Sequence, residues 1–345
     1  MLYDRRDFGL LRLAGTYQWL PAAPLKKLSA LKTLRREAEL LSTLGLVSYA
    51  RSGEYLMPSP QGYEFLSGID QTCQPPTKRP YAQSPALRRR LEVGTILLTC
   101  IGAGIEPAFG KVEHLKRQPV FFPAFALRNA GGNLMNAACA GFGHWGSTAY
   151  MTLYVSAQNT GFVMTNELGH LHNLASVFSE TLDTPQALIL AGESYQSVYE
   201  VLTKKTLSKR HGKKGFVDYS EAYQKLSIPA CIVSCDNTGV MQLAVMRQTD
   251  YRARIAQAAF GARWDSKDDG IPEADGHVDG NPLVIAVDMD LRRLDRVCTA
   301  AVRQGRKEIM VAALEGQMSG LLLSILPKAE LKRIKPEFIE KYLPK

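Results

Sequence analysis

The chain has 345 residues, which is enough for two domains that each bury a hydrophobic core. Its 46% hydrophobic and 22% charged residues are ordinary for a soluble globular protein. The formal net charge is +9, and residues 1–90 hold 14 Lys and Arg against seven Asp and Glu, so that quarter carries +7. A basic excess in one segment favours a polyanionic partner for it, the alternative being a basic domain without a nucleic-acid role.

The sequence does not indicate a membrane protein or a secreted one. The N-terminal residues MLYDRRDFG are charged and do not form a signal peptide, and the longest apolar run, 93–105, is too short to cross a bilayer. The cysteines form no CxxC pair, which is typical of reduced thiols (Cys73, Cys100, Cys139, Cys231, Cys235, Cys298). We expect a cytoplasmic protein without a membrane partner.

Residues 4–66 predict, in order, a helix, a short helix, a longer basic helix, two short strands and the start of another helix. Apolar residues near helical spacing mark the first helix (Phe8, Leu11, Ala14, Trp19). Pro21 and Pro24 break that helix and begin the second, to which Leu25 and Leu28 contribute apolar side chains.

The third helix has two contrasting faces. Its apolar residues recur at steps of three and four up to Gly45, which predicts a buried stripe (Leu31, Leu34, Ala38, Leu41, Leu44). The opposite face carries Lys32, Thr33, Arg35, Arg36 and Glu39. Cations contact phosphates, and Arg or Lys also binds guanine edges, so this face predicts a recognition helix in a major groove. The alternative is a solvated charged face.

A hairpin follows the basic helix. Two short apolar segments, 46–49 and 54–57, flank the turn at Ser52-Gly53. Arg51 lies beside the tip, where it would reach the DNA backbone or the minor groove. The order of these elements predicts a winged-helix domain over residues 1–68 that binds double-stranded DNA and requires no cofactor.

The segment from Asp7 to Leu66 resembles the winged helix that opens replication-relaxation family proteins of plasmids and integrative conjugative elements. The matching runs are Arg6-Asp7-Phe8, Leu34-Arg35-Arg36-Glu37 with Leu41, Leu44-Gly45-Leu46-Val47, and 55–62 (YLMPSPQG). The resemblance covers about one fifth of the chain. It implies a role in plasmid replication or conjugation and a restriction-endonuclease-like fold for the C-terminal region.

Residues 69–90 predict a linker that ends in Arg88-Arg89-Arg90, which would either extend the DNA footprint or begin a solvated helix. In residues 91–345, strand-like runs alternate with helical patterns that begin near 167, 194, 237, 291 and 319 (strands 150–156, 161–164, 187–191, 229–235, 282–287, 308–314). This alternation predicts an α/β domain with a mixed or largely parallel sheet, so that the whole chain combines a winged helix with a larger α/β domain.

Two loops stand out in the α/β region. Residues 204–214 contain six cations and predict a flexible basic loop that adds DNA contacts, unless it is simply solvated (Lys204, Lys205, Lys209, Arg210, Lys213, Lys214). Residues 265–281 are acidic and glycine-rich but lack the spacing of an EF-hand, so we expect a mobile surface insertion without a metal.

Known catalytic motifs are missing: neither a phosphate-binding P-loop nor a G-x-S-x-G elbow occurs. Glu167, His170 and His172 are possible metal ligands, but His170 and His172 point to different sides of a helix, so we expect no metal there.

The best enzyme candidates are Asp288 and Asp290 after one predicted strand and Glu315 and Gln317 after the next, where α/β folds bind ligands. A Mg²⁺-dependent nuclease of the restriction-endonuclease type usually has Lys at the position of Gln317. The alternative role of Asp290 is to cap the helix that follows it.

The sequence thus favours a non-enzymatic DNA-binding accessory or regulatory protein of a mobile element. Its partners would be duplex DNA and relaxase or replication proteins, with a homodimer also open. The alternatives are a metal-dependent nuclease with a winged-helix targeting domain, and a transcription regulator whose α/β domain senses a ligand.

Overall fold

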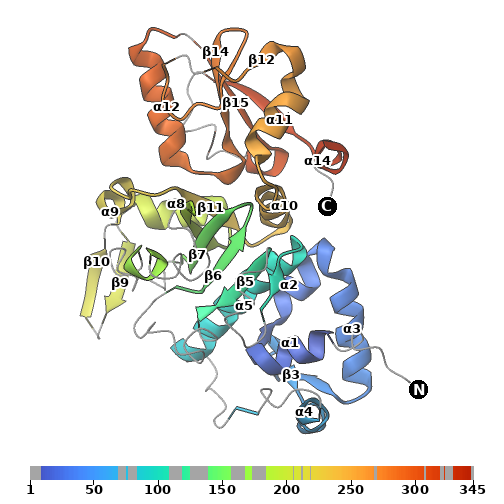
Figure 1. The fold of residues 1–345 in the computed structure, drawn as a ribbon. Coiled ribbons are helices and arrows are strands. Elements are labelled where there is room, and N and C mark those ends of the chain that lie inside the picture. Colours follow the sequence, from blue (N-terminus) through green and yellow to red (C-terminus); the bar gives the residue numbers. More distant parts are fainter. Residues whose placement is uncertain are drawn as a thin grey trace.

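The computed structural model describes residues 9–68, 75–76, 84–108, 119–124, 139–156, 168–172, 184–204, 206–210, 213–217, 219–267, 270–306, 308–318, 322 and 329–342. The fold is mixed α/β and contains three units in chain order (Figure 1). We call them the N-terminal unit (9–68), the middle unit (84–246) and the C-terminal unit (251–342).

The N-terminal unit consists of short helices and a three-stranded antiparallel sheet in the order β1-β3-β2. Its elements are α1 (Gly9–Tyr17), β1 (Leu20–Pro21), α2 (Ala22–Lys27), the 3₁₀ helix η2 (Ser29–Leu31), α3 (Lys32–Thr43), β2 (Val47–Tyr49), β3 (Tyr55–Pro58) and α4 (Pro60–Ser67). The three helices, the hairpin and the closing helix occur in the predicted order. The strand β1 was not predicted, and α1 ends before Trp19 because Gln18 adopts a positive φ of 55°.

The middle unit is built on a six-stranded mixed sheet of order β11-β8-β7-β6-β5-β4. Strands β7, β8 and β11 are parallel, and β5, β6 and β7 form an antiparallel meander. The strands are β4 (Glu106–Pro107), β5 (Val120–Pro123), β6 (Gly141–Trp145), β7 (Thr148–Tyr154), β8 (Gln186–Gly192) and β11 (Ala230–Ser234). The accompanying elements are α5 (Pro85–Gly102), α8 (Tyr195–Thr203), α9 (Ser220–Gln224), α10 (Asn237–Met246) and a separate hairpin of β9 (Thr206–Arg210) and β10 (Lys213–Val217).

The C-terminal unit contains a five-stranded sheet of order β12-β13-β14-β15-β16, in which the last three strands are parallel. Its strands are β12 (Trp264–Asp265), β13 (His277–Val278), β14 (Asn281–Ile285), β15 (Ile309–Leu314) and β16 (Ala329–Ile334). Its helices are α11 (Tyr251–Phe260), η4 (Gly261–Arg263), η5 (Ala286–Asp288), α12 (Leu291–Arg303), η6 (Glu315–Gln317) and α14 (Pro336–Tyr342).

Several helices begin where a short polar side chain caps the first turn. Ser84 accepts a hydrogen bond from the backbone N–H of Leu87 at the start of α5, and Asp236 accepts one from Gly239 at the start of α10. Asp290 does the same for α12, as the sequence predicted. Such caps satisfy backbone donors that have no partner inside the helix and therefore fix where it begins.

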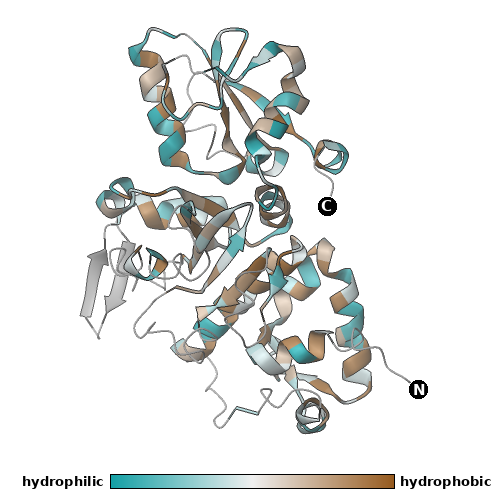
Figure 2. Ribbon diagram, viewed as in Figure 1, coloured by the Kyte–Doolittle hydropathy of each residue, from teal (hydrophilic) through white to brown (hydrophobic). Residues whose placement is uncertain are grey.

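One hydrophobic core runs through two units. It joins α1, α2 and α3 of the N-terminal unit to α5, α10 and one face of the middle sheet (for example Leu11, Leu41, Leu97, Trp145, Ile189). Figure 2 shows α5 and the sheet strands as largely hydrophobic. The two units are also joined by a hydrogen bond, 2.5 Å long, that Tyr17 Oη donates to the carbonyl of Ala108. The N-terminal unit is therefore fixed to the middle unit.

The predicted strands 187–191, 229–235, 282–287 and 308–314 correspond to β8, β11, β14 and β15. Residues 161–164 lie outside the described residues, as do most of 167–180 and the helix start at 319. The last six residues of the predicted linker, 85–90, are the first residues of α5.

One loop prediction was wrong, and a second was wrong in part. The basic segment contains the β9–β10 hairpin, paired from Thr206↔Val217 to Arg210↔Lys213. The acidic segment contains part of β12 and all of β13, and Glu273 and Asp275 bind arginines of α12. A charge-rich segment has the composition of a loop. Ion pairs with residues far along the chain leave no local sequence pattern, so an ordered charge-rich segment cannot be told from a loop.

Candidate functional site

The outward face of α3 is basic. Lys32, Thr33 and Arg36 are exposed, whereas Leu31, Ala38 and Leu41 are buried on the opposite side. Neither Lys32 nor Arg36 makes a hydrogen bond or an ion pair with another residue that the structure describes. Both cations are therefore available to an external anion.

Arg35 has a different role from its neighbour Arg36. Its Nε donates to the carbonyl of Leu25 at 2.9 Å, and Nη2 donates to the carbonyl of Leu28 at 3.4 Å. These carbonyls end α2, so Arg35 joins α2 to α3. The sequence placed Arg35 among the DNA-binding residues because periodicity alone does not separate a flanking cation from an outward one.

The buried stripe predicted for α3 is shorter than expected. Leu44 is 54% exposed and Leu40, one turn earlier, is 58% exposed. The helix ends at Thr43, and Gly45 adopts a positive φ of 70°, so the chain leaves the core at this point. The prediction that Leu44 is buried was therefore wrong.

Further cations lie on the elements beside α3. Arg51 is exposed in the turn between β2 and β3, as predicted. Lys26 and Lys27 are exposed in the last turn of α2, and the Nζ of Lys26 lies 5.8 Å from the ring centre of Tyr49 in β2. Neither lysine was among the predicted DNA-binding residues, although cations in the last turn of a helix are visible in the sequence.

The second basic segment is the β9–β10 hairpin. Lys204 is exposed at the end of α8 and forms an ion pair with Glu200 at 2.9 Å. Lys205 lies outside the described residues. Lys209 pairs with Lys214 and Arg210 pairs with Lys213 in the backbone register, so four cationic residues lie at adjoining ends of the two strands.

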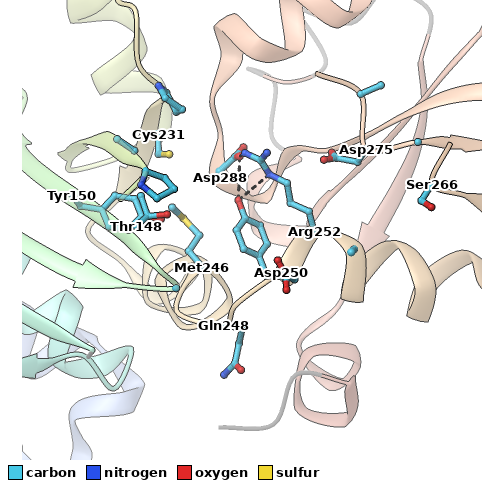
Figure 3. A pocket seen from close by; sticks show the side chains of 18 of the residues that line it. Thr148, Tyr150, Cys231, Met246, Gln248, Asp250, Arg252, Ser266, Asp275 and Asp288 are labelled. Atoms are coloured by element: carbon cyan, nitrogen blue, oxygen red, sulfur yellow. Dashed lines mark hydrogen bonds and ion pairs between the residues drawn. The ribbon is translucent and has the colours of Figure 1, made fainter. Parts of the chain in front are cut away.

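A cleft of about 510 Å³ lies between the middle and C-terminal units (Figure 3). Thr148, Tyr150, Cys231 and Met246 line one side of the cleft, and Arg252 approaches Asp288 on the other. The volume is that of a small-molecule site. Because the cleft lies between two sheets, its lining belongs to both units.

Asp288, which the sequence offers as a candidate catalytic residue, is buried, and its carboxylate interacts with neighbouring residues. It forms an ion pair with Arg252, accepts a hydrogen bond from Tyr251 Oη at 3.1 Å, and lies 3.8 Å from Arg293. Its other oxygen accepts from the backbone N–H of Asp290 at 3.2 Å. Burial tends to raise the pKa of Asp288, but Arg252 and Arg293 outweigh burial and lower it.

Asp290 has the opposite electrostatics. Burial, together with the charge of Asp288, raises the pKa of Asp290 despite Arg292. Its oxygens accept from the backbone N–H groups of Ala230 and Arg293, each at 3.3 Å. It therefore joins the start of β11 to the start of α12, a structural role.

Gln317 and Glu315, the other two candidate catalytic residues, do not form a cluster with Asp288 and Asp290. Gln317 is buried, and its amide accepts from the Leu314 N–H at 3.0 Å and donates to the Val287 carbonyl at 2.8 Å. Glu315 is exposed. Nowhere in the described parts of the chain do three His, Cys, Asp or Glu side chains form a group able to hold a metal ion.

His170 is partly buried and His172 exposed, with the buried Leu171 between them, in agreement with the prediction that they point to different sides. Glu167 lies outside the described residues.

Comparison of the chain with protein families, curated proteins and solved structures found no match. Within the described residues, none of the helices has the length and apolar character needed to cross a membrane.

Proposed function

We propose that the N-terminal unit is a winged helix that binds double-stranded DNA, with α3 as its recognition helix. Support comes from the consecutive helices α2 and α3, the β2–β3 hairpin after them and the strand β1 that pairs with β3. The observation that carries the proposal is the pair of exposed cations, Lys32 and Arg36, on the outward face of α3.

The residues of this face suit the two kinds of contact that DNA offers. A lysine or arginine neutralises phosphates and releases counterions, and an arginine also binds O6 and N7 of guanine in the major groove. Arg51 in the hairpin turn would contact the backbone beside the same groove. Arg35 would position the recognition helix through its hydrogen bonds to the carbonyls of Leu25 and Leu28.

In this proposal the protein is an accessory or regulatory protein of a mobile genetic element. The resemblance of residues 7–66 to the replication-relaxation family supports that role, as does the location of +7 of the net charge in the first 90 residues. The middle and C-terminal units would then provide assembly or partner contacts, including contacts to relaxase or replication proteins.

The test is DNA binding by the double variant Lys32→Ala/Arg36→Ala. We expect affinity for duplex DNA to fall at least tenfold, and the slope of log K against log[salt] to become shallower by about 0.9 for each phosphate that the variant no longer neutralises. Arg303→Ala, which removes an exposed cation from α12, is the matched control. Equal affinity and salt slope in the double variant would refute the assignment of α3.

A second candidate function, ligand sensing, is favoured by α10. The end of this helix lines the cleft through Met246, and its start contacts η2, where Asn237 Oδ1 accepts from the backbone N–H of Ser29 at 2.8 Å. Between them, Gln242 donates to the carbonyls of Ile232 and Asp288. One helix therefore connects the cleft to the segment that precedes α3.

Filling the cleft tests this second candidate. Ala253 lines the cleft on α11, and Ala253→Trp should occupy part of it and change DNA affinity at least threefold. Gln257→Trp, at an exposed position of the same helix outside the cleft, is the control. If both variants bind DNA like the unmodified protein, the cleft is not coupled to α3.

The geometry gives less support to a nuclease, since Asp288 and Asp290 are engaged with arginines and backbone groups and Gln317 holds two backbone groups. The direct test is incubation of supercoiled and linear DNA with Mg²⁺ or Mn²⁺. Cleavage that disappears in Asp288→Ala or Glu315→Ala would establish the nuclease instead.

A further inference from the structure

The outward face of α3 changes from charged to apolar along the helix. Lys32, Arg36 and Leu40 are exposed and follow one another at a spacing of four residues, so they form one row on the helix surface. Leu44 continues this row directly after the last residue of the helix. Leu40 is 58% exposed and Leu44 is 54% exposed. The two cations proposed to bind DNA are therefore followed by two leucines that the fold leaves in water.

Leu40 contributes little to the hydrophobic core. The buried side of α3 is formed by Leu31, Ala38 and Leu41, which belong to the core shared with α1 and α5. Leu40 lies on the outward side, where most of it remains accessible to water. Burying such a side chain against a partner removes apolar surface from water and stabilises the complex. A single exposed leucine is common on protein surfaces, so its neighbours must indicate what covers it.

The neighbour that indicates the partner of Leu40 is Arg36. Its charge suits a polyanion, and on a helix in the major groove an arginine binds O6 and N7 of guanine. Because a helix rises about 1.5 Å per residue and base pairs are stacked about 3.4 Å apart, Leu40 lies about 6 Å, or about two base pairs, from Arg36. A groove that holds Arg36 therefore also holds Leu40.

The base edges of the major groove offer one apolar group to a leucine. Thymine carries a C5-methyl group there, whereas the other edges present hydrogen-bond donors and acceptors. We propose that Leu40 is a specificity-determining residue that packs against the methyl group of a thymine, about two base pairs from a guanine bound by Arg36. This inference rests on the proposed function of α3 and names the base pairs that it recognises.

The experiment starts with the full chain and a library of random duplexes, from which the bound sequences are selected. Each thymine of the selected site is then replaced, one at a time, by deoxyuridine, which lacks the methyl group and keeps the same base pair. We expect one replacement to weaken binding about fourfold, the effect of one buried methyl group. This measurement uses the unmodified protein and does not depend on the folding of a variant.

The variant Leu40→Ala completes the test. It should bind the thymine duplex more weakly than the unmodified protein does, by about fourfold or more, and should bind the thymine and deoxyuridine duplexes equally well. Val302→Ala, which shortens a side chain that is 69% exposed on α12, is the matched control and should keep the full response to deoxyuridine.

A second base analogue locates the guanine. Replacing one guanine by 7-deazaguanine removes the N7 acceptor, so it should weaken binding by the unmodified protein and have no effect on Arg36→Ala. The sensitive guanine should lie about two base pairs from the sensitive thymine. A sensitive pair more than half a helical turn apart would contradict the assignment, since Arg36 and Leu40 are adjacent in the row.

The possible failures are distinguishable. If the unmodified protein binds no duplex, the proposed function of α3 fails. If it binds duplex DNA through Lys32 and Arg36 but selects no sequence, or responds to deoxyuridine at none of the thymines, the thymine contact is wrong while the function of α3 stands. The same holds if Leu40→Ala keeps the full response to deoxyuridine.

One further outcome would assign Leu40 to a protein contact. If Leu40→Ala weakens binding to the thymine and deoxyuridine duplexes by the same factor, and light scattering shows a dimer for the unmodified protein and a monomer for the variant, the leucines join two copies of the chain. This result would overturn the thymine contact.

Discussion

Two neighbouring arginines on α3 have different surroundings. The guanidinium of Arg35 donates to the carbonyls of Leu25 and Leu28, whereas Arg36 faces water. Since hydrogen bonds to charged groups contribute about 1.5–3 kcal/mol each, Arg35→Ala should lower the free energy of unfolding by about 2 kcal/mol. Arg36→Ala should leave it within about 0.5 kcal/mol. Urea denaturation of both variants checks this, and equal stabilities would contradict it.

Asp288 should make stability depend on pH in the acid range. Arg252 and Arg293 hold the pKa of Asp288 below its usual value, so the native state favours the charged form. The resulting stabilisation is complete above the unfolded pKa of about 3.9 and is lost as pH falls through the lower native pKa. Asp288→Asn leaves the partly exposed Arg252 and the buried Arg293 without this partner and should cost about 3 kcal/mol at pH 7.

The measurement is denaturant unfolding of the unmodified protein and of Asp288→Asn from pH 7 down to pH 3. The stability difference between them should shrink toward pH 3. A difference that stays constant over this range would mean that Asp288 is not the titrating group.

At the scale of one side chain, the sequence predicted the exposure of Lys32, Arg36 and Arg51 and the capping role of Asp290. It did not predict that Arg35 ties two helices together or that Asp288 faces Arg252. Arg35 bonds to carbonyls, which every residue has and which leave no sequence pattern. Asp288 and Arg252 are far apart in the chain, and only the fold brings them together.

Helix α10 contacts all three units: η2 in the N-terminal unit, α5 and β11 in the middle unit, and η5 in the C-terminal unit. Its first turn lies so close to β11 that a Cβ on Gly239 would be 1.6 Å from the carbonyl oxygen of Ser234. Gly239→Ala must therefore displace the helix or the strand, and overpacking of this kind costs about 1–3 kcal/mol.

Thermal denaturation of Gly239→Ala checks this expectation. Gly169→Ala is the matched control, since none of the described residues places an atom within 4 Å of its added Cβ. We expect a lower melting temperature in the first variant only. Equal melting temperatures would show that α10 can move away from β11 at no cost, which would weaken its role in connecting the cleft to η2.

At the scale of elements, the sequence predicted the buried parallel strands well, since β8 and β15 are continuous apolar runs. It missed β6, whose sequence GFGHW contains two glycines, and β16, whose sequence AELKRI contains three charged residues. Pairing with neighbours stabilises such strands, and this pairing is invisible in a single segment. The β9–β10 hairpin was also missed. Its composition is that of a loop, and the pairing of its strands is not visible in the sequence.

Over the whole molecule, the shared core predicts cooperative unfolding of the N-terminal and middle units. Leu11 of α1 is fully buried in the same cluster as Ile189 of β8. Leu11→Ala should cost about 2–5 kcal/mol and accelerate amide exchange in β8 as well as in α1. Leu283→Ala, in the separate core of the C-terminal unit, is the comparison.

Hydrogen exchange followed by mass spectrometry gives both readouts in one experiment. Faster exchange confined to α1 and α3 in Leu11→Ala would show that the N-terminal unit unfolds by itself.

The position of α5 has a consequence for how this protein can be divided. Residues 9–68 look like a self-contained piece in the sequence, yet several of their apolar side chains are covered by α5 and the middle sheet. A chimera made by grafting these residues alone onto another protein would expose that surface to water and tend to aggregate. Extending the graft through Ala108 would add α5 but not the middle sheet or α10, which belong to the same core, so the N-terminal unit is not an interchangeable cassette.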